Sequence, residues 1–141
     1  MAEPYQRLVL LVQQEVGERI RAKPGSSAFS ALSVRMQLLA HCATVCPVPP
    51  RCFQPPPKVN SEVICLRPLA EPLQLNIAIT VEKLLKSAFA ARRKMLRNTL
   101  CQFVPEGELQ NWLNQADVSA QQRPQEIGPN KWVALATALL A

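Results

Sequence analysis

The run LVLLV at residues 8–12 decides the fold class of this 141-residue chain. Five consecutive apolar residues without alternation predict a strand buried on both faces, which is typical of a parallel sheet covered by helices. A short helix is predicted over residues 14–21, ended by KPGSS at 23–27, and a second helix over residues 32–40. The amino-terminal part is therefore predicted to be α/β.

Two further strands are predicted at residues 44–48 and 62–67, on either side of the stretch FQPPPKV at 53–59. Consecutive prolines fix φ, remove backbone donors and favour an extended, stiff geometry. We therefore expect Phe53 to be held on a rigid loop beside the sheet. Residues 67–72 are predicted to be a linker.

The pattern after the linker is helical. Six apolar residues share one arc of a helical wheel: Val81, Leu85, Phe89, Leu96, Leu100 and Phe103. Arg92 lies in the same arc, so either its side chain snorkels to solvent or the helix breaks near it. Shorter helices are predicted at 108–114 and 131–140, with a helix start at Pro124, a break at residues 128–129, and Trp112 and Trp132 in the core. The predicted fold class is α/β followed by all-α, with residues 1–69 in the α/β part and residues 70–141 in a small helical domain.

The predicted strands are too few for a complete parallel sheet. A buried parallel strand needs neighbouring strands and covering helices to satisfy its backbone groups and apolar side chains. The sequence therefore indicates the carboxy-terminal part of a larger protein.

Composition narrows the class of protein. With 48% hydrophobic and 18% charged residues, the chain is globular rather than disordered. Its apolar runs are too short to span a bilayer, and no signal peptide is evident, so we expect a cytoplasmic protein without a membrane partner. An odd set of five cysteines argues against a disulfide framework. His41, Cys42, Cys46 and Cys52 could form a zinc site, but their spacing is loose, and we predict buried free thiols and no metal.

The positive charge is concentrated in one stretch. The net charge is +6, and residues 83–105 contain six basic residues and no acidic residue: Lys83, Lys86, Arg92, Arg93, Lys94 and Arg97. Such a stretch is either a solvated helix face or a surface that binds a polyanion. Arg123 and Glu126 are expected to cap or pair within the helical domain.

Several separated stretches resemble one family, the rRNA adenine N6-dimethyltransferases, and most closely its bacterial small-subunit members. They are LVLLVQQEVGERI (8–20), PGSSAFSALSVRMQ (24–37), VPPRCFQPPPKVNSEVI (48–64), FAARRKMLRNTL (89–100) and, more weakly, ADVSAQQRPQEI (116–127). The combination of FxPxPKVxS with RRKxLxN is specific. Phe29 and Ser30 depart from the Tyr and Gly that are common in the family.

The resemblance implies a fold and a set of roles. It implies the last strands of an S-adenosylmethionine-dependent, Rossmann-like methyltransferase sheet, followed by a helical domain that binds small-subunit rRNA. Phe53 would stack on the flipped adenine, since aromatic faces repay part of the unstacking cost. The candidate RNA-binding residues are Lys58, Arg92, Arg93, Lys94 and Arg97. The immature small ribosomal subunit would be the partner, and the chain a monomer if it folds alone.

The resemblance does not extend to the cofactor site. The family holds S-adenosylmethionine with a Gly-rich turn and grips the target amine with an Asn-x-Pro-Tyr-type motif. In this chain the four glycines are unclustered, and no such motif occurs. We therefore expect the cofactor to bind only in the complete enzyme, and this chain alone to be inactive. Two alternatives remain open: a non-catalytic RNA-binding or ribosome-assembly module, and a truncated gene remnant.

Overall fold

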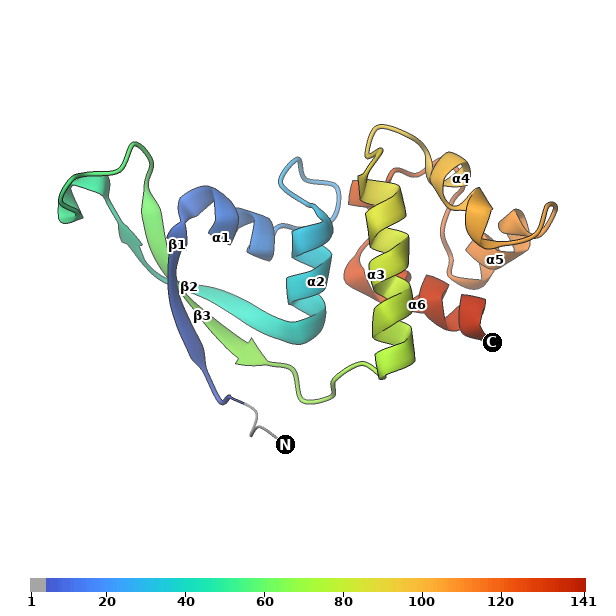
Figure 1. Cartoon of the computed structure of the whole chain (residues 1–141), viewed down its shortest axis with the longest axis horizontal. Coiled ribbons are helices and arrows are strands. Elements are labelled where there is room, and N and C mark those ends of the chain that lie inside the picture. Colours follow the sequence, from blue (N-terminus) through green and yellow to red (C-terminus); the bar gives the residue numbers. More distant parts are fainter. Residues whose placement is uncertain (1–4) are drawn as a thin grey trace.

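The computed structural model describes residues 5–141 (Figure 1). Three strands form one antiparallel sheet in the order β1-β3-β2, with bounds β1 Leu8–Gln13, β2 Ala40–Val48 and β3 Ser61–Pro68. Helices α1 (Gln14–Arg21) and α2 (Ala31–Leu39) lie between this sheet and the remaining helices (Figure 1). The fold class predicted from the sequence, α/β followed by all-α, is confirmed.

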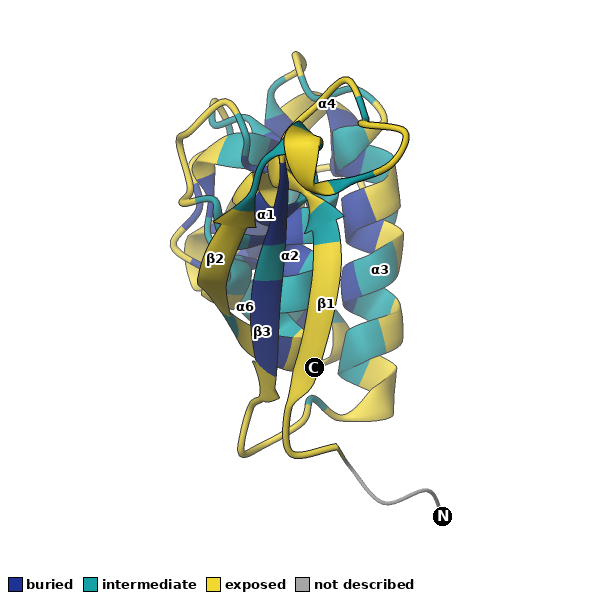
Figure 2. Cartoon of the chain, turned by 90° about the vertical axis from the view of Figure 1, so that its left-hand side faces the viewer, coloured by how far each residue is buried: buried dark blue, intermediate teal, exposed yellow. Residues whose placement is uncertain are grey.

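The prediction of a buried parallel strand at residues 8–12 was wrong for the part of the chain that the structure describes. Strand β1 exists, but it pairs antiparallel with β3, from Leu8 opposite Leu66 to Gln13 opposite Ser61. It lies at the edge of the sheet and is largely exposed (Figure 2). The reason is topological: β3 enters between β1 and β2 and runs opposite to both.

One face of the sheet is covered by α1 and α2. Their apolar side chains pack on β3 through a small core cluster of Ile20, Ala40, Ile64 and Leu66. Ser33 connects the two helices, because its hydroxyl accepts a hydrogen bond from the Ser30 N–H (3.0 Å) and donates one to the Arg19 carbonyl. The opposite face of the sheet carries no helix among residues 5–141 (Figure 2).

The second half of the chain is helical. Its α-helices are α3 (Leu75–Phe89), α4 (Leu96–Thr99), α5 (Leu109–Gln115) and α6 (Pro129–Leu140). The 3-10 turns of the chain are Pro50–Cys52, Cys101–Phe103 and Pro124–Glu126. Helix α3 ends at Phe89, before Arg92, so the predicted break is the correct alternative. Helix α6 begins at Pro129, two residues before the predicted start at residue 131, because proline's fixed φ and missing donor suit the first helical position.

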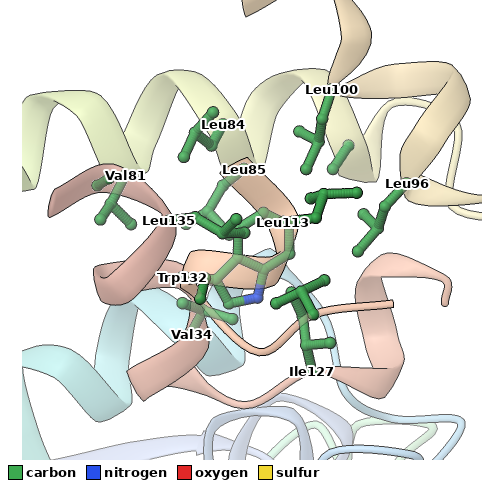
Figure 3. Close-up of a cluster of buried hydrophobic side chains, with 14 of the residues drawn as sticks. Val34, Val81, Leu84, Leu85, Leu96, Leu100, Leu113, Ile127, Trp132 and Leu135 are labelled. Carbon is green, nitrogen blue, oxygen red and sulfur yellow. The ribbon is translucent and has the colours of Figure 1, made fainter. Parts of the chain in front are cut away.

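The main hydrophobic core lies among these helices (Figure 3). Trp132 is fully buried at its centre, and its ring lies 5.9 Å from the Phe89 ring between centroids. Trp112 is also buried, and its indole N–H donates to the Leu135 carbonyl at 2.9 Å. Both tryptophans are therefore core residues, as predicted. The same cluster includes Phe29 and Val34 from the first half of the chain, so one core joins both halves.

The prediction of buried thiols was wrong for Cys46, Cys52 and Cys101, which are exposed, and right for Cys65. Within residues 5–141, no group of three or more His, Cys, Asp or Glu side chains could hold a metal ion. No helix in the same range combines the length and apolar character needed to cross a bilayer.

Candidate nucleic-acid interface

The proline loop (residues 49–60) connects β2 to β3 and projects from one end of the molecule (Figure 1). The turn Pro50–Cys52 begins it, and the Phe53 N–H donates to the Pro50 carbonyl at 3.1 Å. The peptide bond before Pro55 is cis. The Phe53 side chain is half-buried, so it is partly anchored and still partly open to a ligand, whereas Lys58 is exposed. At the other end of the loop, the Asn60 carbonyl accepts from the Gln14 N–H at 2.9 Å.

The basic turn (residues 90–97) connects α3 to α4. Three of its four basic side chains, Arg93, Lys94 and Arg97, are exposed. None of the three is in an ion pair within the described range, 5–141. Exposed cations without acidic partners are available to phosphate oxygens.

Arg92 has a different environment from its neighbours. Its Nη2 donates to the carbonyl oxygens of Ser27 (3.4 Å) and Phe29 (3.3 Å), and its side chain is half-buried. Arg92 therefore connects the basic turn to the loop before α2. An RNA contact by Arg92 stays a prediction, and it would have to share the guanidinium with these carbonyls.

Arg123 also fixes the backbone of the basic turn, through a contact separate from those of Arg92. Its Nε donates to the Arg93 carbonyl at 2.9 Å, and its backbone N–H donates to Glu126 Oε1 at 3.4 Å. Just before Arg123 in the chain, the carbonyl oxygens of Gln122 and Ala120 accept hydrogen bonds from the Leu96 and Arg97 N–H groups, respectively. The predicted capping role of Arg123 and Glu126 is therefore confirmed, and the exposed cations sit on a fixed backbone.

The proline loop and the basic turn are not adjacent. They lie on opposite sides of the α1 and α2 layer (Figure 1). The structure thus separates the basic turn, which carries Arg92, Arg93, Lys94 and Arg97, from the proline loop, which carries Phe53 and Lys58. A single ligand that contacts both regions has to extend along the molecule, as a folded RNA can.

The RNA-binding candidates predicted from the sequence do not include three other exposed cations, which lie on the elements that adjoin or contact the basic turn. Lys83 and Lys86 lie on α3 just before the basic turn. Lys23 lies on the loop that Arg92 contacts, and that loop is also bonded to the carboxy-terminal part, from the Gly25 N–H to the Gln125 carbonyl at 2.8 Å. Lys83 and Lys86 belong to the stretch of residues 83–105 that contains no acidic residue, whereas no local sequence pattern connects Lys23 with that stretch.

A buried ion pair supports the sheet below α1. Glu62 on β3 is almost fully buried and forms a salt bridge with Arg21. A Cβ at Gly17 would overlap Glu62 Oε1, so glycine is needed there for space. The Glu62 carboxylate raises the pKa of Arg21, and burial raises the pKa of the nearby Cys42 thiol, partly offset by Arg21. These groups hold the sheet to α1 and do not form an open site.

Two features of residues 5–141 bear on the S-adenosylmethionine site: their glycines and their cavities. Gly25 and Gly107 have positive φ but nothing near their Cβ positions, so neither approaches a ligand cradle formed by other residues. A cavity of about 1030 Å³ is lined mainly by Leu38, Leu39, Leu69 and prolines, without a carboxylate for a ribose. That the cofactor binds in the complete enzyme stays a prediction.

Comparison with known proteins identifies the family. A family model described as ribosomal RNA adenine dimethylase matches residues 1–139. The chain belongs to the ribosomal RNA adenine dimethylase family. Its relatives include "Ribosomal RNA small subunit methyltransferase A" of Synechococcus sp. (strain CC9605), at 66% identity over 96% of this chain and 50% of the relative. The protein of the same name from Prochlorococcus marinus (strain MIT 9303) is 62% identical, over 96% and 49%.

Two solved structures have the same fold over most of this chain. A dimethyladenosine transferase from Plasmodium falciparum superposes with a TM-score of 0.77 at 26% identity, covering 93% of this chain and 56% of that one. The 23S rRNA methyltransferase ErmE superposes with a TM-score of 0.69 at 24% identity, covering 96% and 55%, and shows the fold alone. The chain thus spans about half the length of the dimethylases that it matches.

Proposed function

We propose that this chain is the rRNA-docking part of a small-subunit rRNA adenine N6-dimethyltransferase. The observation that carries the proposal is the family match over residues 1–139, in a chain that carries Arg93, Lys94 and Arg97 exposed and, within residues 5–141, without an ion pair on one fixed turn. In the complete enzyme the methyl donor would be S-adenosylmethionine, and the acceptor would be adenine N6 near the 3′ end of the small-subunit rRNA. The immature small subunit in the cytoplasm would be its partner.

The basic turn would bind the phosphate backbone. Arg93, Lys94 and Arg97 would contact phosphates, which position an RNA without reading its sequence. The hydrogen bonds from Arg92 and Arg123 support this role, because they fix the backbone that carries the cations.

The proline loop would receive the target base. A methyltransferase that acts on a base amine has to take the base out of its stack, and an aromatic face compensates part of the cost. Phe53 is half-buried at the start of a proline run, so its ring is held in place and partly accessible. Lys58, exposed on the same loop, would neutralise a phosphate next to that base.

The proposal is tested by separating RNA binding from methyl transfer. The chain is titrated with a hairpin from the 3′ end of small-subunit rRNA at several salt concentrations, and methyl transfer from radiolabelled S-adenosylmethionine is measured in parallel. We expect binding that weakens steeply with salt, and no methyl transfer by the chain alone. Salt-independent binding, or binding no tighter than that of an acidic protein of equal size, would contradict the proposal.

A further inference from the structure

The loop before α2 contains a tight turn that starts at Lys23, the KPGS turn (residues 23–26). The Ser26 N–H donates to the Lys23 carbonyl at 3.1 Å, and the Ser26 hydroxyl donates to the same oxygen at 2.8 Å. Proline followed by a glycine with positive φ suits the two central positions of a type II turn, and Gly25 has φ +90°. The backbone that carries Lys23 is therefore fixed by its own sequence.

The KPGS turn is bonded to the segment that also supports the basic turn. The Gly25 N–H donates to the Gln125 carbonyl at 2.8 Å. Arg123, two residues earlier in that segment, donates through Nε to the Arg93 carbonyl on the basic turn at 2.9 Å. Residues 120–128 are thus a common support for the KPGS turn and the basic turn.

Arg92 joins the basic turn directly to the residues that follow the KPGS turn. Its Nη2 donates to the carbonyl oxygens of Ser27 and Phe29, at 3.4 and 3.3 Å. The three segments 23–29, 90–97 and 120–128 are therefore hydrogen-bonded to one another in pairs. Figure 1 shows the light blue loop before α2 and the yellow loop after α3 on the same side of the molecule.

The charges on these segments are almost all positive. Lys23 is the one charged residue in the sequence from 22 to 30, its side chain is exposed, and it forms no ion pair within residues 5–141. The single acidic residue of the three segments is Glu126, and its Oε1 accepts the Arg123 backbone N–H at 3.4 Å. A polyanion bound to the basic turn therefore meets a further cation on the neighbouring turn.

We propose that the KPGS turn is a second phosphate-binding element, in which Lys23 contacts the backbone of the same RNA that binds the basic turn. The inference rests on the proposed rRNA docking and extends it, because it carries the RNA-binding surface from the helical domain onto the first half of the chain. The lysine ammonium acts as a point charge on a phosphate, so Lys23 would position the RNA and not read its sequence.

The test measures how RNA binding depends on salt. The unchanged chain and Lys23→Gln are titrated with a hairpin from the 3′ end of small-subunit rRNA at several salt concentrations. Loss of one phosphate contact should lower the slope of log K against log salt by about 0.7–0.9. Lys23→Arg keeps the charge and should retain the slope of the unchanged chain. The matched control is Arg67→Gln, which removes an exposed cation near the end of β3 and should leave the slope unchanged. Thermal melts verify that each variant is folded.

Hairpins with one neutral phosphate locate the contact. In each hairpin a single methylphosphonate removes the charge of one phosphate. At the phosphate that Lys23 contacts, the methylphosphonate should weaken binding by the unchanged chain and cause no further loss in Lys23→Gln. The same comparison with Arg93→Ala should identify a different phosphate of the same hairpin, since Lys23 and Arg93 lie on different segments of one bonded cluster.

Three outcomes would overturn the inference while the proposed function stands. The first is a slope for Lys23→Gln equal to that of the unchanged chain. The second is an equal loss of slope in Arg67→Gln, which would indicate a general effect of net charge. The third is a Lys23→Gln chain that loses as much affinity as the unchanged chain at every methylphosphonate. Salt-independent binding by the unchanged chain would instead overturn the proposed function, and this inference with it.

Discussion

The guanidinium of Arg92 donates a hydrogen bond to the backbone oxygen of Phe29, at 3.3 Å and across 63 positions of sequence. Phe29 is fully buried in the helical core, so this bond joins the basic turn to a fixed point. The sequence predicts Arg92 as one of five RNA-binding candidates, with no feature that sets it apart from Arg93, Lys94 and Arg97. In the folded chain it differs from Arg93 and Lys94, which are exposed.

Replacement of Arg92 by alanine should lower stability. The two carbonyls that it bonds would lose a charged donor, and because the site is only half-buried we expect a cost of about 0.5–1.5 kcal/mol. Chemical denaturation measures this cost. Arg93→Ala is the matched control, since its side chain is exposed, and it should change stability by less than about 0.5 kcal/mol. An equal loss of unfolding free energy in Arg92→Ala and Arg93→Ala would show that the Arg92 hydrogen bonds do not stabilise the fold.

The double variant Arg93→Ala, Arg97→Ala should flatten the salt dependence of RNA binding. Each phosphate contact contributes about 0.7–0.9 to the slope of log K against log salt, so the slope should fall by about 1.4–1.8. The control is Arg7→Gln with Arg67→Gln, which removes two exposed charges outside the basic turn. A slope that stays the same in the double variant, or falls as much in the control, would count against the basic turn as the RNA contact.

Phe53→Ala should slow methyl transfer in a complete dimethylase whose carboxy-terminal half is this chain. Loss of one base-stacking contact costs about 1–3 kcal/mol. The value of kcat/KM should then fall by about 5- to 150-fold. Phe53→Tyr keeps the ring and should retain most of the activity, and Val59→Ala, exposed on the same loop, serves as a control. Full activity of Phe53→Ala would exclude the stacking role.

Gly17→Ala should destabilise the chain although alanine is the better helix former. The added methyl would displace the Glu62 carboxylate from Arg21, with an expected cost of about 1–3 kcal/mol. In a Glu62→Ala background, Gly17→Ala should leave the unfolding free energy unchanged or raise it, because the obstructing carboxylate is gone. A double-mutant cycle of unfolding free energies measures the coupling, and the absence of coupling would show that the helix moves aside.

Phe29→Ala should destabilise both halves of the chain together. A fully buried phenylalanine replaced by alanine typically costs about 3–5 kcal/mol. Because Phe29 packs into the helical core, the fluorescence of Trp132 and the far-ultraviolet dichroism should report one transition with the same lower midpoint. Two separate transitions would instead favour independent domains divided near residue 70.

The positions of the helices were largely predictable because they depend on local pattern. The periodic apolar residues of α3 and the break near Arg92 are local features, and the structure confirms them, whereas α6 begins at Pro129, two residues before its predicted start. The direction and exposure of β1 were not predictable from LVLLV, since those depend on which strand lies beside it. The pairing of β1 with β3 joins residues more than 45 positions apart, such as Leu11 with Val63.

The sequence by itself determined the family, the strand and helix positions, and the concentration of positive charge before Leu100. Only the tertiary structure decided how the candidate residues are used. In the folded chain Arg92 donates hydrogen bonds to backbone carbonyls, Arg93 and Lys94 are exposed, and the proline loop that carries Phe53 lies on the far side of α1 and α2 from the basic turn. The physical reason is that hydrogen-bond partners and burial are set by residues distant in sequence, which no local pattern encodes.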